Sequence, residues 1–313
     1  MSESAADEST ATIVVAVIVN LLITAFKVAA AVVTGSSAML SEAIHSAVDT
    51  LNEALLFVGV SRSKRAPDES HPLGHGQELY FWTLIVAVVI FGAGGSISIF
   101  EGIHRLLAPR PLENVVWSYA VLGVALGLES VSWVVAYRAL RLRAGAKSTW
   151  SVIRESKDPT VFTVLLEDTA ALIGLGIALL GTLAQQLGLD KADGLASIGI
   201  GLVLCCVAFI VIRESRALLS GESASPEVVE AVRAILASED TIESIDSIVT
   251  LHFGPDSVLL ILTVTFAPSS SAGLAETIDR IRSRIVVDVP SIKTVSVSLS
   301  SLTSLRNARA PYG

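Results

Sequence analysis

His45 and Asp49 lie four residues apart in a stretch of chain that is otherwise apolar enough for lipid. Positions i and i+4 of a helix share one face, so the imidazole and the carboxylate point the same way. Asn52 continues this stripe. An ionisable side chain at membrane depth costs roughly 3 kcal/mol on insertion scales, which makes it a functional-site candidate. Imidazole nitrogen and carboxylate oxygen are ligands of zinc and its first-row neighbours, so the pair predicts a metal site.

Two further carboxylates, Glu167 and Asp168, interrupt another apolar segment. They are costly there unless they meet a cation, a proton or a polar cavity. Because neighbouring residues diverge by about 100° on a helix, they do not face one point. We expect Asp168 to be a ligand beside His45 and Asp49, and Glu167 to be a fourth ligand or a proton carrier. The alternative is that Glu167 or Asp168 only pairs with the buried Lys27.

A third group of donor side chains lies in a loop that contains Gly and Pro. Asp68, His71 and His75 are spaced by three and four residues and could close around a metal ion at the mouth of the membrane path. The two histidines could equally shape a structural turn beside Pro72 and Gly74. The spacing of the three residues is compatible with both interpretations.

Other features of the apolar segments have simpler interpretations. Glu53, Glu101 and Glu129 are acidic residues in or near these segments, and we expect a structural role for each rather than a ligand role, with the lining of a cavity as the alternative for Glu129. The small residues from Gly92 to Ser96 predict close packing of one helix against another.

The composition is that of a polytopic membrane protein. Of 313 residues, 52% are hydrophobic and 17% charged, and the mean hydropathy is +0.66. The net charge of −8 argues against a nucleic-acid partner, because proteins that bind nucleic acids carry basic patches. Cys205 and Cys206 are adjacent and would diverge on a helix, so they make a poor chelating pair. No nucleophile motif is present, and we do not expect an enzyme.

Hydropathy predicts six membrane helices, each near the roughly 20 residues that a bilayer requires. The expected spans are Ala11–Val33, Ser36–Ser61, Leu79–Leu106, Val115–Leu140, Thr160–Leu187 and Gly194–Leu219. Together they form a transmembrane domain over residues 11–219, after an acidic tail of residues 1–10. The tight turn at Thr34-Gly35 joins the first two spans as an antiparallel hairpin. Lys and Arg gather in the loops after spans two and four and at the end of span six, so both termini are expected to face the cytoplasm. The expected location is a bacterial inner (cell) membrane.

Residues 222–300 have the composition of a small cytoplasmic α+β domain. The pattern predicts helices from Pro226 and over Leu274–Val287, and strands over Ile245–Phe253, Val258–Phe266 and Ile292–Leu299. The order α-β-β-α-β suggests a ferredoxin-like or metallochaperone-like open sandwich. Residues 301–313 are expected to form a loose tail. The expected fold class is thus an α-helical polytopic membrane protein with six transmembrane helices and this cytoplasmic domain.

Several strings of the chain resemble one known family. They are Thr34-Gly35-Ser36-Ser37-Ala38-Met39-Leu40-Ser41-Glu42-Ala43-Ile44-His45-Ser46, the loop His71-Pro72-Leu73-Gly74-His75-Gly76, and Leu165-Leu166-Glu167-Asp168-Thr169-Ala170. With the six spans and the α-β-β-α-β tail, they resemble the cation diffusion facilitator family. The third string is most similar to the branch that includes the animal mitochondrial zinc transporter.

The resemblance implies a homodimer in the lipid bilayer that exports zinc from the cytoplasm in exchange for protons, by alternating access. Mn²⁺, Fe²⁺, Co²⁺ and Ni²⁺ are the other candidate substrates. It implies a transport site on His45, Asp49 and Asp168, and a second metal site on the loop residues Asp68, His71 and His75.

One departure from the family pattern affects the transport site. Typical zinc members have a His four residues before the Asp of span five, and this chain has Val164 there. Glu167, Asn52 or water must therefore complete the ligand shell. The missing His also favours an alternative function, a non-transporting dimeric membrane protein that binds metal or acts as a scaffold.

Overall fold

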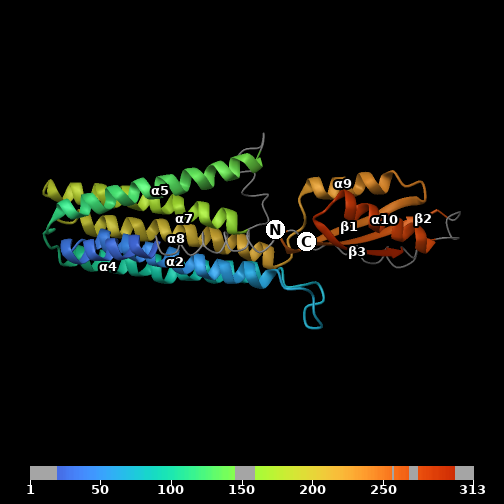
Figure 1. Ribbon diagram of the computed structural model, residues 1–313, viewed down its shortest axis with the longest axis horizontal. Helices are drawn as coiled ribbons and strands as arrows, with labels where there is room; N and C mark the ends of the chain where they lie inside the picture. The colour runs from blue at the N-terminus through green and yellow to red at the C-terminus, as the bar shows by residue number, and fades with distance from the viewer. Residues whose placement is uncertain (1–19, 145–158, 256, 268–273, 300–313) are drawn as a thin grey trace, which may run out of the picture. The chain divides into compact units, whose positions relative to one another are not determined.

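The computed structural model describes residues 20–144, 159–255, 257–267 and 274–299 (Figure 1). The predicted tails, residues 1–10 and 301–313, and the start of the first predicted span lie outside the described residues. The chain divides into two compact units. One contains the residues up to Ser61 together with Leu79–Arg216, and the other contains Arg62–Glu78 together with the residues from Ala217 onward.

The first unit is a bundle of long helices that run side by side in Figure 1. Its described elements are helix Asn20–Thr34, α2 (Ser37–Ser63), α3 (Glu78–Val89), the π-helix η1 (Ile90–Ser96), α4 (Ile97–Leu107), α5 (Val115–Ala144), α7 (Pro159–Gln186) and α8 (Ala192–Leu219). Within the described residues, four helices are long and apolar enough to cross a membrane, namely Glu78–Leu107, Val115–Arg138, Phe162–Gln186 and Ala192–Leu219. Large apolar side chains point outward from them, as a lipid environment requires; examples are Phe100, Val116, Leu180 and Phe209.

The expected helical membrane protein is therefore confirmed for four apolar helices, and the count of six spans stays a prediction. Helix Asn20–Thr34 is apolar but shorter in the described part of the chain. Helix α2, with 27 residues, is long enough to cross a membrane but is not apolar enough to be counted, because it carries many buried polar residues.

The predicted turn between the first two helices is confirmed. Gly35 has a φ of +63°, a left-handed conformation that Gly adopts without steric cost. Its amide donates to the Ala31 carbonyl at 2.9 Å, which closes the end of helix Asn20–Thr34.

The carboxylate of Asp193, from the start of α8, caps the beginning of α2. It accepts hydrogen bonds from the amides of Ser37 at 2.6 Å and Ala38 at 3.3 Å, and from the hydroxyls of Ser36 and Ser37. These amides have no partner inside α2, so Asp193 satisfies donors that a helix start leaves free. Arg105 of α4 places its Nε 3.3 Å from the same carboxylate. Three helices are thus joined at one buried carboxylate.

Glycines allow α4 and η1 to approach α8 closely. A Cβ added to Gly102 would lie 2.7 Å from the Gly194 carbonyl oxygen, and one added to Gly201 would lie 2.8 Å from that of Gly95. No side chain fits between these backbones, so the close packing predicted from the Gly92–Ser96 run is confirmed at Gly95.

The second unit contains a three-stranded sheet and two helices. Its elements are α9 (Pro226–Ala237), β1 (Ile242–Gly254), β2 (Ser257–Phe266), α10 (Leu274–Asp288) and β3 (Ile292–Leu299), which follow the predicted order. The sheet order is β1-β2-β3, with β1 antiparallel and β3 parallel to β2. Alternate residues of β2 are buried, so one sheet face is apolar. That face packs with buried residues of both helices, including Val232, Leu236, Ile281 and Ile285.

Candidate metal sites

The polar stripe of α2 lies inside the helix bundle. His45 is buried, and its Nδ1 lies 3.2 Å from Asp49 Oδ1, across one helical turn as the spacing predicts. Asn52 is fully buried on the next turn. Among the described residues, neither His45 Nε2 nor Asn52 Oδ1 has a hydrogen-bond partner. Buried polar atoms without partners are costly, so this face of α2 is suited to bind a ligand.

A polar cavity of about 80 Å³ lies against this stripe. A single water needs roughly 10–15 Å³ of such space, so the cavity has room for an ion with several waters. Its walls come from helix Asn20–Thr34, α2, α5 and α7, and five carboxylates border it: Asp49, Glu53, Glu129, Glu167 and Asp168. Acidic residues far apart in the sequence therefore surround one space inside the bundle.

The two carboxylates of α7 point to different partners, as their adjacency predicts. Asn52 Nδ2 donates to Glu167 Oε1 at 2.7 Å, and Ser132 Oγ of α5 donates to Asp168 Oδ2 at 3.2 Å. Glu167 is buried, and Asp168 borders the cavity together with Asp49. Of the five side chains predicted to form a transport site, Asp49, Glu167 and Asp168 border this cavity, whereas His45 and Asn52 are buried on α2 next to it, and the donor atoms do not converge on one point. In the part of the chain that the structure describes, the only three His, Cys, Asp or Glu residues with donor atoms within 4.8 Å of one another are Asp68, His71 and His75.

Val164 also borders this cavity. The position that carries a His in typical zinc members of the family therefore faces the cavity here, with an apolar side chain. Because Val164 offers no imidazole nitrogen, the potential metal ligands on the cavity walls are mostly oxygen atoms.

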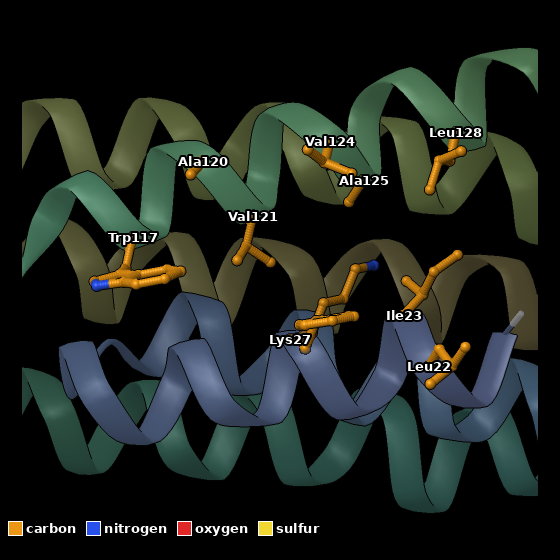
Figure 2. A pocket seen from close by; sticks show the side chains of 10 residues that line it. Leu22, Ile23, Lys27, Trp117, Ala120, Val121, Val124, Ala125 and Leu128 are labelled. Atoms are coloured by element: carbon orange, nitrogen blue, oxygen red, sulfur yellow. The ribbon is translucent and has the colours of Figure 1, made fainter.

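The alternative in which Lys27 pairs with Glu167 or Asp168 is wrong. Lys27 Nζ lies 3.4 Å from Glu42 Oε2 and donates to Ser46 Oγ at 2.7 Å, with Lys27 and Glu42 fully buried. The carboxylates of α7 are therefore not neutralised by this ammonium. Figure 2 shows the stem of Lys27 among the apolar side chains of a separate cavity of about 390 Å³, between helix Asn20–Thr34 and α5. That larger cavity has an almost wholly apolar lining and does not suit a metal ion.

Glu53 and Glu129, for which the sequence predicted structural roles, both border the polar cavity. Glu53 lies four residues after Asp49 on α2 and accepts a hydrogen bond from Asn20 Nδ2 at 2.7 Å. The four-residue spacing from Asp49 was a signal in the sequence that places Glu53 on the same helix face. Glu129 has no such neighbour, and only the packing of α5 against α7 brings it to the cavity.

The loop residues form a compact cluster in the second unit. Asp68 Oδ2 lies 3.0 Å from His75 Nε2, and the rings of His71 and His75 have centroids 4.2 Å apart. Hydrogen bonds from the Ser70 hydroxyl and the His71 amide, with the contact to His75, hold the pKa of the Asp68 carboxyl well below its usual range. Asp68 is therefore an anion at neutral pH beside two imidazoles, which is a donor set that suits zinc. Gly76 lies against the backbone of Phe253 and Gly254, where an added Cβ would clash.

Residues 13–220 match the family model for the cation efflux transmembrane domain. The chain therefore belongs to the cation efflux family, the cation diffusion facilitators.

Named relatives fit this assignment. The chain is 40% identical to the mitochondrial proton-coupled zinc antiporter of Mus musculus over 236 residues, which are 72% of this chain and 41% of that protein. It is 32% identical to a metal tolerance protein of Arabidopsis thaliana over 70% of this chain and 49% of that protein. It is 26% identical to a manganese efflux system protein of Bacillus subtilis over 71% of this chain and 72% of that protein. The resemblance to the animal mitochondrial zinc branch is therefore confirmed. The chain spans less than half the length of these animal and plant relatives.

The expected location in a bacterial inner membrane is wrong. The relatives from mouse, human, orangutan and Xenopus, at 38–40% identity, are mitochondrial proteins of animals. These matches indicate a membrane protein, but not one of a bacterial inner membrane. The basic loops that suggested an orientation carry no information about which membrane contains the protein.

Proposed function

We propose that this protein carries zinc or a similar divalent transition metal across a membrane in exchange for protons. The observation that supports this best is the carboxylate-lined cavity beside His45 and Asp49, inside a bundle of apolar helices. Charged groups in such a place are costly, and they are retained where they bind an ion or carry protons. The relatives named as a zinc antiporter and a manganese efflux protein support an ion of this class.

In the proposed transport site, α2 contributes His45 and Asp49, and α7 contributes Asp168. Asn52 and Glu167 complete the shell, because the Asn52 carbonyl oxygen has no hydrogen-bond partner among the described residues and its amide group donates to Glu167. Small movements of α2 and α7 would bring these donors onto one ion. The site contains one imidazole and several oxygens, a set that accepts manganese as well as zinc.

Proton coupling follows from the same ligands. His and carboxylate side chains bind a metal only when they are deprotonated, so protons and metal compete for the site. If six spans alternate between two conformations, protons entering from one side release the metal there and leave on the other side. We propose export from the side that the basic loops face. On that side Asp68, His71 and His75 would collect the ion before it reaches the membrane site.

We further propose that the protein works as a homodimer, in which the C-terminal α+β domain contributes to the contact between subunits. This rests on the family resemblance, and cross-linking of the full chain in membranes tests it. A single band at the monomer mass under all cross-linker lengths would contradict it.

A transport assay in sealed proteoliposomes tests the main proposal. Zinc uptake should follow an imposed pH gradient and stop when a protonophore collapses it. Asp49→Asn should abolish uptake, whereas Asp190→Asn, which changes an exposed carboxylate outside the cavity, should not. Metal flux that ignores the pH gradient would refute coupling. Metal binding without flux of any divalent ion would favour the alternative, a non-transporting metal-binding or scaffold protein, to which Val164 in the cavity wall points.

A further inference from the structure

Lys27 and Glu42 form a buried ion pair that the proposed transport cycle does not use. Both side chains are fully buried, and Nζ lies 3.4 Å from Oε2. The same ammonium donates to Ser46 Oγ at 2.7 Å. Lys27 comes from helix Asn20–Thr34, and its stem lies among apolar side chains in Figure 2. The charge is therefore enclosed within the bundle.

This pair lies beside the proposed metal ligands. Glu42 precedes His45 by three residues, so both belong to the same face of α2. Ser46 follows His45 directly and borders the polar cavity together with Asp49. The Lys27 ammonium therefore contacts a residue of the cavity wall, and Glu42 lies about one helical turn from His45 along α2.

At that distance a single unbalanced charge would dominate the binding of a cation. Over one turn of roughly 5.4 Å, at an effective dielectric constant of about 20, a unit charge changes the affinity for another unit charge by about a hundredfold. An unpaired Lys27 would oppose a divalent ion, and an unpaired Glu42 would attract it. Together the two charges nearly cancel.

A purely structural role explains the pair poorly. Glu42 Oε1 has no hydrogen-bond partner among the described residues, although it is buried. It lies against Gly174 of α7, where a Cβ would overlap it, so the chain leaves room for the carboxylate there without offering it a donor. Buried ion pairs also contribute little net stability, because apolar replacements of both partners are often neutral.

We propose that the Lys27–Glu42 pair sets the metal affinity of the site formed by His45 and Asp49. Glu42 cancels the ammonium charge that would otherwise repel the ion, and Ser46 holds the ammonium against the cavity wall. Lys27 and Glu42 are positioning residues that act through charge and do not contact the metal. The inference rests on the proposed function only in taking His45 and Asp49 as metal ligands.

Zinc binding and zinc flux, measured on the full chain, test this proposal separately. Binding is followed by titration calorimetry in a background of His71→Ala with His75→Ala, so that the loop does not contribute. Flux is measured in proteoliposomes with the loop intact. The variants are Glu42→Gln, Lys27→Met and the double variant, with Lys191→Met as the control because Lys191 is an exposed lysine.

Glu42→Gln should weaken zinc binding and raise the KM for flux at least tenfold, because Lys27 is then uncompensated. Lys27→Met should tighten binding at least tenfold and lower the maximal flux, since the ion is released more slowly. The double variant should restore the dissociation constant to within about threefold of the starting value, and Lys191→Met should change nothing. The conservative variant Glu42→Asp should keep most of the affinity.

Affinities that shift in the same direction in both single variants, or not at all, would overturn the proposal. If Glu42→Gln does not fold, Lys27→Met and the double variant still decide, because only a charge effect predicts tighter binding in Lys27→Met and a return to the starting affinity in the double variant. If the variants show the expected pattern of zinc affinities but the unmutated protein carries no zinc flux, the transport function is refuted and the role of the pair stands. Normal flux with unaltered binding in Lys27→Met would refute the pair's role and leave transport intact.

Discussion

Replacing Asp193 with Ala should weaken the bundle more than any other single change at this end of the molecule. The carboxylate is fully buried and accepts hydrogen bonds from Ser36, Ser37 and Ala38 at the start of α2. It also faces Arg105, which is 8% exposed. The substitution therefore removes the cap of one helix and leaves a buried guanidinium without its counter-charge.

The size of the effect follows from these two losses. Breaking a buried ion pair by removing one partner costs about 3–5 kcal/mol, and losing an N-cap costs about 1 kcal/mol. Because both losses occur at one residue and overlap, we expect about 4 kcal/mol in total. For a domain of this size, 1 kcal/mol corresponds to about 2–4 °C, so the apparent Tm should fall by about 10 °C.

The assay is a thermal challenge of the detergent-solubilised protein, followed by size-exclusion chromatography of what remains folded. Asp190→Ala is the matched control, since it removes an exposed carboxylate three residues earlier in the chain. The double variant Asp193→Ala with Arg105→Leu should recover part of the loss, because no buried charge is then left alone. A fall no larger than that of Asp190→Ala would refute the reasoning. So would a double variant less stable than the single one.

Three further predictions concern the proposed metal sites. Asp49→Ala should abolish zinc flux in proteoliposomes while the elution volume of the protein stays unchanged, because a ligand is lost without loss of packing; surviving flux would remove Asp49 from the site. Val164→His should raise the preference for zinc over manganese by about tenfold in a competition assay, since it adds an imidazole to the cavity wall; an unchanged ratio would contradict this. His71→Ala with His75→Ala should raise the zinc concentration for half-maximal flux and lower maximal flux less than Asp49→Ala does. Unchanged stoichiometry and affinity in titration calorimetry would make the loop purely structural.

The sequence predicted what depends on local patterns. Apolar runs located the long helices to within a few residues, and the two-residue turn at Gly35 was predictable because its conformation depends on a few neighbouring residues. The i, i+4 spacing of His45 and Asp49 correctly placed them on one face, because helix geometry alone determines that relation.

Long-range pairings could not be predicted in the same way. Ser37 and Asp193 are 156 residues apart, and no local pattern links them. The sequence offered Lys27 several carboxylates within apolar segments, and only the packing of helix Asn20–Thr34 against α2 selects Glu42. Glu129 likewise borders the cavity because α5 packs against α7. No spacing of residues in the sequence indicates that these two helices are neighbours.

Asn52 connects the proposed metal ligands of α2 to Glu167, the proposed proton carrier of α7. Its amide nitrogen donates to Glu167 at 2.7 Å, while its carbonyl oxygen is buried without a partner among the described residues. In the proposed site that oxygen can bind the ion from α2 while the same side chain keeps Glu167 oriented on α7. A protonated Glu167 could donate a hydrogen bond of its own, for which this oxygen is a nearby acceptor. Metal and proton would then compete for the Asn52 oxygen as well as for the charged ligands, so that exchange needs no separate proton path.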